Sequence, residues 1–351
     1  MSDLPRLGVA LVAFNSADVI LDCLESLLAS EGVGLDIVLV DNASDDGTVA
    51  LLRDWAAGRH IHVAAADCPF ALPPAAPRAL ALDGSPVAGL AHRLTLVETG
   101  VNGGFAAGVN AALAVLARDS RSDRFWVLNP DSMVPPGTAA AFATCPAPPG
   151  GFALMGGRVL YLETPELIQI DGGTINRRTG VTGNLNLGQR HDQTPPPAPG
   201  AMDFITGASM VASRRFYETR GPMEEDYFLY YEEVDWALGR GDLPLVYCPG
   251  ALVYHRAGTA IGSPTLGRPA SPFSLYFKHR GRLRFLRRHR PAALPGGLLY
   301  SAAKAAQLAL KGYPREAWTI LTASLDLPAS AAIRSRLGPA AAARAFGRKP
   351  R

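Results

Sequence analysis

Short apolar runs alternate with amphipathic segments along the first part of the chain. Residues 7–13 and 36–40 are continuous apolar runs, which are typical of strands covered on both faces of a parallel sheet. After the first run, apolar residues recur at helical spacing over 19–28, and a second helical stretch follows the polar turn 41–48. The pattern therefore predicts the order strand, helix, strand, helix.

The alternation is then interrupted and resumes. A third strand is predicted around residues 60–64, and residues 66–93, rich in Ala, Pro and Leu, indicate an inserted surface loop. A strand at 94–98, a glycine-rich turn, a helix at 106–117 and a strand at 124–129 follow. This order predicts a Rossmann-like, mostly parallel, doubly wound α/β sheet.

The pattern changes after residue 150. Turn signals separate strand-like pieces, and the chain ends in a predominantly helical portion. The predicted elements are strands at 156–161, 167–175 and 202–212, an acidic helix from Tyr231, a strand at 243–247 and helices from Pro272.

Composition limits the class of protein. With 351 residues, 48% of them hydrophobic, the chain can bury a large core. The four cysteines are far apart, which predicts neither a zinc site nor a disulfide framework. A net charge of +3 gives no reason to expect nucleic acid as a partner. The sequence opens without a signal peptide pattern and contains no apolar run of bilayer length, so we expect a cytoplasmic protein.

Polar residues follow the predicted strands at their carboxyl ends, where open α/β sheets bind ligands. Asn15, Asp41, Asn102 and Asp131 occupy such positions. A single carboxylate there can hold Mg²⁺ together with phosphate oxygens, although Asp131 could equally be a turn residue or a helix N-cap. His255 ends another apolar run and could complete a metal site, although a lone histidine is more often structural.

A second acidic group marks the start of the acidic helix. Glu232, Glu233 and Asp235 follow the aromatic run 227–231. The helix dipole stabilises carboxylates at this position, so the group could be no more than a charged first turn. Apolar surroundings can also raise the pKa of a carboxyl group such as Glu233 and make it a better general base.

The chain resembles glycosyltransferase family 2, which has the GT-A fold. Within that family it resembles the bacterial rhamnosyltransferase-like members. The likeness extends from residue 7 to about residue 262. The matching motifs precede the histidine segment and occur in family order at 12–15, 40–48, 102–110, 129–132 and 226–236.

The resemblance implies a role for each matching residue. Asn15, Asp41 and Ser44 would line the nucleotide pocket, and Asn102, Gly104 and Asn110 would form the donor face. Asn129 and Asp131 would represent the D-x-D metal motif, with Asp131 and His255 as ligands of Mg²⁺ or Mn²⁺. Glu233 would be the catalytic base, where relatives usually have aspartate, and Glu232 and Asp235 would support it.

The implied function is inverting transfer of a sugar from a nucleotide-diphosphate donor to a hydroxyl of a glycan or lipid-linked glycan in polysaccharide or cell-wall synthesis. The resemblance favours dTDP-rhamnose as donor, and UDP-hexoses and a galactofuranose donor stay open. The catalytic domain would span residues 1–270, with an acceptor-side half at 150–262, and a basic helical extension would span 271–351.

Three alternatives compete with this interpretation. A dinucleotide-dependent oxidoreductase would need G-x-G-x-x-G after the first strand, where this chain has Phe14-Asn15-Ser16. A nucleotidyltransferase that makes sugar nucleotides usually has an early glycine-rich loop with a basic residue, which is also missing. A catalytically silent sugar-nucleotide or glycan binding protein of the same fold would not need Asp131, Glu233 and His255 together.

The basic segment Lys278–Arg290 interleaves Lys and Arg with Leu and Phe. It could be a solvated helix face, a contact with anionic headgroups or a lipid-diphosphate acceptor at the inner membrane face, or a site for the donor diphosphate.

Overall fold

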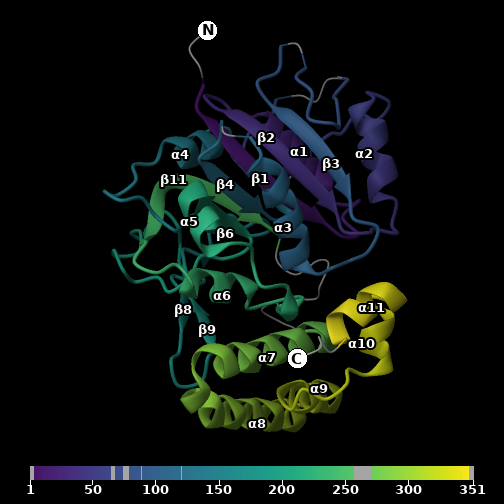
Figure 1. The fold of residues 1–351 in the computed structure, drawn as a ribbon, viewed down its shortest axis with the longest axis vertical. Helices are drawn as coiled ribbons and strands as arrows, with labels where there is room; N and C mark the ends of the chain where they lie inside the picture. Colours follow the sequence, from purple (N-terminus) through teal and green to yellow (C-terminus); the bar gives the residue numbers. More distant parts are fainter. Residues whose placement is uncertain are drawn as a thin grey trace.

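The computed structural model describes residues 4–64, 68–73, 79–87, 89–119, 121–256 and 270–347. A large sheet lies at its centre, with helices on both faces and further helices below (Figure 1). The sheet strands are β1 Arg6–Ala13, β2 Gly34–Asp41, β3 Arg93–Glu98, β4 Arg124–Leu128, β5 Ser132–Met133, β6 Leu154–Tyr161, β7 Ile168–Ile170, β10 Ser209–Ser213 and β11 Leu245–His255.

The strand order is β3-β2-β1-β4-β10-β6-β11-β5, and β7 pairs with β6. The first four strands are mutually parallel, whereas β10 is antiparallel to both β4 and β6. A separate ribbon pairs β8 (Gly173–Ile175) with β9 (Thr182–Asn184). The expected α/β architecture with a mostly parallel sheet is confirmed.

Two apolar layers sandwich the sheet, because its central strands are buried on both faces. Along β1, Leu7, Val9 and Leu11 pack toward one layer and Ala10 toward the other. The first layer contains α1 (Ile20–Leu28), α2 (Thr48–Ala56) and α4 (Thr138–Thr144). The second contains α3 (Phe105–Leu116), α5 (Arg214–Arg220) and α6 (Glu232–Leu238).

The C-terminal helices form their own packing units beyond the sheet. The long α7 (Pro272–His289) contacts the second layer through Leu283, Phe285 and Leu286. Below it lie α8 (Leu294–Leu310) and α9 (Pro314–Ser324), and α10 (Ala331–Ser335) and α11 (Gly338–Phe346) follow (Figure 1). Short 3₁₀ turns occur at Glu225–Tyr227 and Pro291–Ala293. Among the described residues, no helix is both long and apolar enough to cross a bilayer.

The strand predicted at residues 60–64 is wrong. Residues 60–64 have no strand structure, and the place beside β2 is taken by β3. Ile61 and Val63 are 52% and 79% exposed, so pairing here would bury no apolar face. The imidazole of His62 instead bonds the Asp22 carboxylate of α1 at 2.7 Å. A short run of apolar and polar residues therefore does not form a strand where no strand of the sheet pairs with it.

Two other boundaries differ. The strand expected over 202–212 shrinks to β10, because residues 207 and 208 form a turn ahead of it. The strand expected to end before Cys248-Pro249 continues to His255, because a register shift between Tyr247 and Leu252 places the proline outside the regular ladder.

Candidate active site

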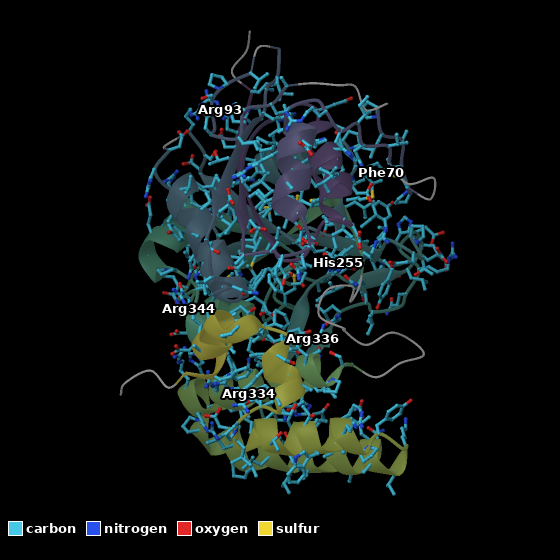
Figure 2. The ribbon with its side chains drawn as sticks, turned by 90° about the vertical axis from the view of Figure 1, so that its right-hand side faces the viewer. Phe70, Arg93, His255, Arg334, Arg336 and Arg344 are labelled. Atoms are coloured by element: carbon cyan, nitrogen blue, oxygen red, sulfur yellow. The ribbon has the colours of Figure 1, made fainter. Side chains whose placement is uncertain are left out.

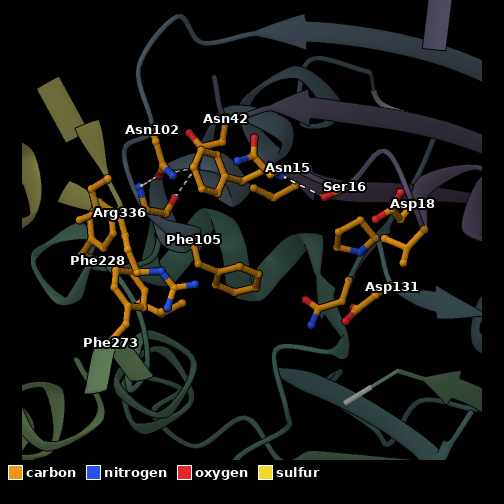
Figure 3. Close-up of a pocket in the computed structure, with 18 of the residues that line it drawn as sticks. Asn15, Ser16, Asp18, Asn42, Asn102, Phe105, Asp131, Phe228, Phe273 and Arg336 are labelled. Carbon is orange, nitrogen blue, oxygen red and sulfur yellow. Dashed lines mark hydrogen bonds between the residues drawn. The ribbon is translucent and has the colours of Figure 1, made fainter. Parts of the chain in front are cut away.

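The carboxyl ends of β1, β2 and β4 meet at one edge of the sheet, because these strands are parallel. A cavity of about 320 Å³ lies at this edge (Figure 3). Its lining residues are Val12, Phe14, Asn15, Ser16, Asp18, Val19, Asn42, Asn102, Gly104, Phe105, Asn129, Pro130, Asp131, Phe228, Leu229, His255, Phe273, Arg336 and Leu337. Six of the predicted site residues therefore share one cavity, namely Asn15, Asn102, Gly104, Asn129, Asp131 and His255.

Asn15 joins the first two loops of this edge. Its backbone has φ 50°, and its amide N–H donates to the Ser44 hydroxyl at 2.9 Å. Its side-chain oxygen accepts from the Asp45 N–H at 2.9 Å. These two hydrogen bonds hold the two loops against each other. Ser44 therefore contributes to the site by fixing the position of Asn15.

Asp41 is buried at the end of β2, and one of its carboxylate oxygens accepts from the Ser44 N–H at 3.0 Å. The other oxygen, Oδ1, is buried and has no hydrogen-bond partner among the described residues. An unsatisfied buried acceptor costs about 1–3 kcal/mol. A donor group on a ligand, such as a base N–H or a ribose hydroxyl, would remove that cost.

Asn42 was not predicted, although it sits at the centre of the edge. Its NH₂ donates to Asn102 Oδ1 at 3.1 Å and to the Gly104 carbonyl at 3.0 Å, and its Oδ1 accepts from the Gly103 N–H at 3.1 Å. Gly104 has φ 89°, and a Cβ there would lie 2.3 Å from the Phe228 carbonyl oxygen. Asn42 thus holds the glycine-rich turn, and the missing side chain lets residue 228 approach it.

Asn110, on α3, holds the segment that leads to α6. Its side-chain NH₂ donates to the Met223 carbonyl at 2.9 Å and to the Glu225 carboxylate at 3.0 Å, and its oxygen accepts from the Met223 N–H at 2.8 Å. Asn110 does not line the cavity of Asp131 but a second pocket, and Asn42 lines both.

Asp131 and His255 come together from β4 and β11. His255 Nε2 lies 3.2 Å from Asp131 Oδ1 and 3.2 Å from the Asn129 amide nitrogen, and Nδ1 lies 2.7 Å from Gln169 Oε1. Burial lowers the pKa of His255, but the Asp131 carboxylate outweighs this effect and the pKa is raised. Gln169 was not predicted; its oxygen can accept a hydrogen bond from Nδ1–H, which leaves Nε2 facing Asp131 and Asn129.

The donor set fits a hard divalent cation that keeps other ligands. One carboxylate and one imidazole face the same space, and the second imidazole nitrogen is held by an amide, as is common for metal-binding histidines. No group of three His, Cys, Asp or Glu side chains with metal-site geometry occurs among the described residues. Phosphate oxygens or water would have to complete the coordination.

The three acids of α6 have different surroundings. Asp235 is fully buried, and it accepts from Arg220 at 3.0 Å, Tyr227 at 2.8 Å and His289 at 2.7 Å. Burial alone would raise the pKa of Asp235, but the bonds from His289 and Tyr227 hold it below the ordinary value. Asp235 therefore ties α6 to α5 and α7.

Glu232 and Glu233 lack such compensation. Glu232 is 2% exposed, and its Oε2 has no hydrogen-bond partner among the described residues. Burial, and then the charge of Glu233, raise the pKa of Glu232 well above its ordinary value. Burial also raises the pKa of Glu233, while the ammonium of Lys278 on α7 opposes the shift. Glu233 does not line the large cavity.

The segment between the cavity and α6 has an unusual backbone. Phe228, Tyr230 and Tyr231 are non-glycine residues with φ of 66°, 67° and 79°. Each such conformation costs about 1–3 kcal/mol and persists only where the surroundings enforce it. The Phe105 N–H bonds the Phe228 carbonyl at 2.9 Å, and the Tyr231 hydroxyl bonds the Gly180 carbonyl at 2.7 Å. These contacts fix the backbone between Phe228 and Leu229, which line the cavity, and Glu233.

The basic segment Lys278–Arg290 is a solvated helix face only in part. Arg280 and Arg282 are buried; Arg280 bonds Asp326 and the Ala345 carbonyl, whereas Arg282 bonds the Gly297 carbonyl and Ser301. Arg288 pairs with Glu224 at 2.9 Å. Several of its cations therefore connect helices of the protein, whereas Lys278 and Arg287 are exposed.

The C-terminal helices supply cavity residues that sequence reasoning missed. Arg336 and Leu337, just after α10, line the cavity together with Phe273 at the start of α7. The Arg336 guanidinium lies 4.9 Å from the centre of the Phe273 ring and points toward the cavity (Figure 3). The side view places this helical part against the end of the sheet domain that carries His255 (Figure 2). No motif marked these residues, because their position depends on tertiary packing.

The first part of the chain is similar to a known protein family. Residues 9–70, which include β1, α1, β2 and α2, match the family described as Glycosyl transferase family 2. The match to this family covers this segment of the chain. A stretch of 48 residues is also 46% identical to the succinoglycan biosynthesis protein ExoO of Rhizobium meliloti (strain 1021), and it covers 14% of each chain.

Solved structures extend the likeness in fold beyond the family 2 segment. GalNAc-T7, solved with UDP, GalNAc and Mn²⁺, is 13% identical with a TM-score of 0.52 over 96% of this chain and 59% of that one. A mannosyltransferase from Pyrobaculum calidifontis, solved with GDP-Man and Mn²⁺, is 15% identical with a TM-score of 0.47 over 93% and 87%. The fold is GT-A.

Proposed function

We propose that the chain transfers a sugar from a nucleotide-diphosphate donor to a hydroxyl group, with inversion at the sugar C1. The observation that carries the proposal is the Asp131–His255 pair, 3.2 Å apart in a cavity at the carboxyl edge of a GT-A sheet whose first part is a family 2 segment. The co-crystallised ligands of GalNAc-T7 and of the Pyrobaculum mannosyltransferase include Mn²⁺ and a nucleotide or nucleotide sugar, which supports this choice.

The nucleotide would occupy the side of the cavity formed by Asn15 and Asn42, next to the unsatisfied Oδ1 of Asp41. Its diphosphate would lie between that side and Asp131, where Asn129, Asp131 and His255 would hold Mg²⁺ or Mn²⁺. A bound cation would neutralise the charge that develops on the departing nucleoside diphosphate. The guanidinium of Arg336 adds positive charge to the same cavity.

Glu233 is the proposed base. Its raised pKa brings the carboxylate nearer to the basicity that a general base needs, and Lys278 keeps it ionised in preference to Glu232. It would take the proton from the acceptor hydroxyl as that oxygen attacks C1. The bond from C1 to the diphosphate oxygen breaks in the same displacement, so no covalent enzyme intermediate forms.

Rhamnose is the favoured sugar on the sequence resemblance, and a glycan or lipid-linked glycan in polysaccharide or cell-wall synthesis is the favoured acceptor. A cytoplasmic location suits such a donor. The likeness to the succinoglycan biosynthesis protein ExoO agrees with a polysaccharide product. A thermal-shift screen of dTDP, UDP and GDP sugars with Mn²⁺ would identify the donor, because a ligand at one hundred times its Kd stabilises by about 2.7 kcal/mol.

The decisive test compares Glu233→Gln with Glu232→Gln. We expect Glu233→Gln to keep the donor-induced thermal shift and to lose transfer by about 10²–10⁴-fold, which is the usual contribution of a general base. Glu232→Gln is the matched control, because the buried Glu232 carboxyl is already the harder one to ionise. Transfer is measured with the donor found in the screen and a panel of glycan acceptors.

Near wild-type transfer by Glu233→Gln would refute the assignment of the base. If several donors bind but neither transfer nor Mn²⁺-dependent donor hydrolysis is detected, the chain would be a sugar-nucleotide binding protein of the same fold. That alternative has no observation of its own in its favour.

A further inference from the structure

The outer sides of α8 and α9 carry large apolar side chains. Leu299 is 71% exposed, Leu310 90% and Trp318 67%. On α8, exposed residues at 299, 303, 306 and 310 follow the spacing of one helix face. Scattered exposed apolar residues are common, but a row along one side of a helix usually marks an interaction surface. We call these outer sides of α8 and α9 the α8–α9 face.

The opposite sides of α8 and α9 are packed inside the protein. Ala305 and Leu308 of α8 pack with Ala317 and Ile320 of α9 and with Leu275 of α7. α8 lies at the end of the molecule farthest from the sheet, with α7 between them (Figure 1). The α8–α9 face therefore points away from the candidate active site, and the buried cluster behind it consists of residues of α7, α8 and α9 together with Ala270.

Basic side chains outnumber acidic ones around this face, although Glu316 lies in the first turn of α9. The sequence contains no Asp or Glu between Asp242 and Glu316, and this interval includes all of α8 and the start of α9. Lys304 lies on α8, and Lys311 and Arg315 are exposed at the turn into α9. Two copies of such a face would repel each other, whereas an anionic surface would attract it.

We propose that the α8–α9 face binds an anionic lipid surface. Leu299, Leu310 and Trp318 would enter the headgroup boundary, and the lysines would contact lipid phosphates, as in helices that lie in the membrane plane. This surface is distinct from Lys278–Arg290, several of whose cations pair with other parts of the protein. The proposal does not depend on the proposed sugar transfer.

The test is co-sedimentation with vesicles of phosphatidylcholine and phosphatidylglycerol, compared with phosphatidylcholine alone, at low salt. We expect binding to the anionic vesicles and at least a ~10-fold lower vesicle affinity for the triple variant Leu299→Glu, Leu310→Glu, Trp318→Glu, because insertion depends on buried apolar area. The matched control is Leu187→Glu, since Leu187 is 54% exposed and lies outside this face. Arg287→Glu tests the basic segment and should leave binding near the wild-type level.

Fluorescence gives a readout that needs no variant. The chain has four tryptophans, and Trp55, Trp126 and Trp236 are buried, so a blue shift on adding anionic vesicles reports Trp318. The inference is overturned if wild type does not sediment with anionic vesicles, or if the triple variant, folded by circular dichroism, binds as wild type does. A wild-type dimer that the triple variant converts to monomer, without vesicle binding, would also overturn it.

Discussion

The two acidic regions of the molecule handle their charges differently. Asp131 lies in a cavity beside His255 and an amide, in a set that leaves room for a ligand. Asp235, on α6, is fully buried and enclosed by Arg220, Tyr227 and His289. A carboxylate enclosed by donors of the protein serves the fold, and one that faces a cavity is available for chemistry. Glu232 and Glu233 lie between these extremes, because Glu232 is buried with an unsatisfied oxygen and Glu233 is half-buried near the ammonium of Lys278.

Replacement of Asp131 gives the largest expected effect. Asp131→Asn keeps the size of the side chain and removes the charge that faces His255, so we expect transfer to fall by about 10²–10³-fold or more, as for loss of one electrostatic group in an active site. The Mn²⁺-dependent part of the donor-induced thermal shift should disappear, while the melting temperature without ligand stays within a few degrees.

Isothermal titration of Mn²⁺ into wild type and Asp131→Asn, with nucleoside diphosphate present, separates cation binding from turnover. Asp192→Asn is a suitable control, because its ion pair with Arg190 is exposed and far from the cavity lining. Equal Mn²⁺ affinity in wild type and Asp131→Asn would remove Asp131 from the proposed cation site.

The opposite result is expected for Asp235. Asp235→Asn leaves Arg220, Arg288 and His289 without their buried anion, and removal of one partner from such a group costs about 3–5 kcal/mol. The free energy of unfolding, measured with urea, should fall by that amount, whereas Asp192→Asn should leave it nearly unchanged, because its ion pair is exposed. A stability loss as small as that of Asp192→Asn would show that the enclosed carboxylate does not support the fold.

The pH dependence of Asp235 has a definite sign. Its pKa is lowered in the folded protein, so the stability it contributes is present above its ordinary value of 3.8 and is lost as pH falls through the folded pKa. Wild type should therefore lose more stability than Asp235→Asn between neutral pH and the acid range. Urea midpoints at a series of pH values measure this difference.

Much of the fold could be predicted, because the buried strands and amphipathic helices of the first half have clear periods. The run at 7–13 became β1, and the run at 36–40 became the centre of β2. The prediction failed at 60–64, where local alternation had no partner in the sheet. Sheet pairing is a tertiary property, and a short alternating run carries no information about it.

Among the residues that line the cavity, only those that follow the sheet strands could be predicted from the sequence. Asn15 and Asp131 follow strands, so parallel topology alone brings them together. Asn42 was missed because its amide bonds a turn 60 residues away in sequence. Arg336 was missed because it comes from the C-terminal helices, which pack across the site. The roles of Asn15, Asp131 and Glu233 stay predictions until the variants are measured.

Glu232→Gln has the smallest expected effect on stability. It tests the case between Asp131 and Asp235, a buried carboxyl group with an unsatisfied oxygen. Because the pKa of Glu232 is raised, the folded protein binds a proton that the unfolded chain releases above the ordinary value of 4.5. Wild type should therefore lose stability as pH rises from that value through the raised pKa. Glu232→Gln removes the titrating group, so its melting temperature should fall less between pH 5 and pH 9 than that of wild type. Parallel melting curves for both proteins would argue against a neutral Glu232 and would weaken the division of labour between it and Glu233.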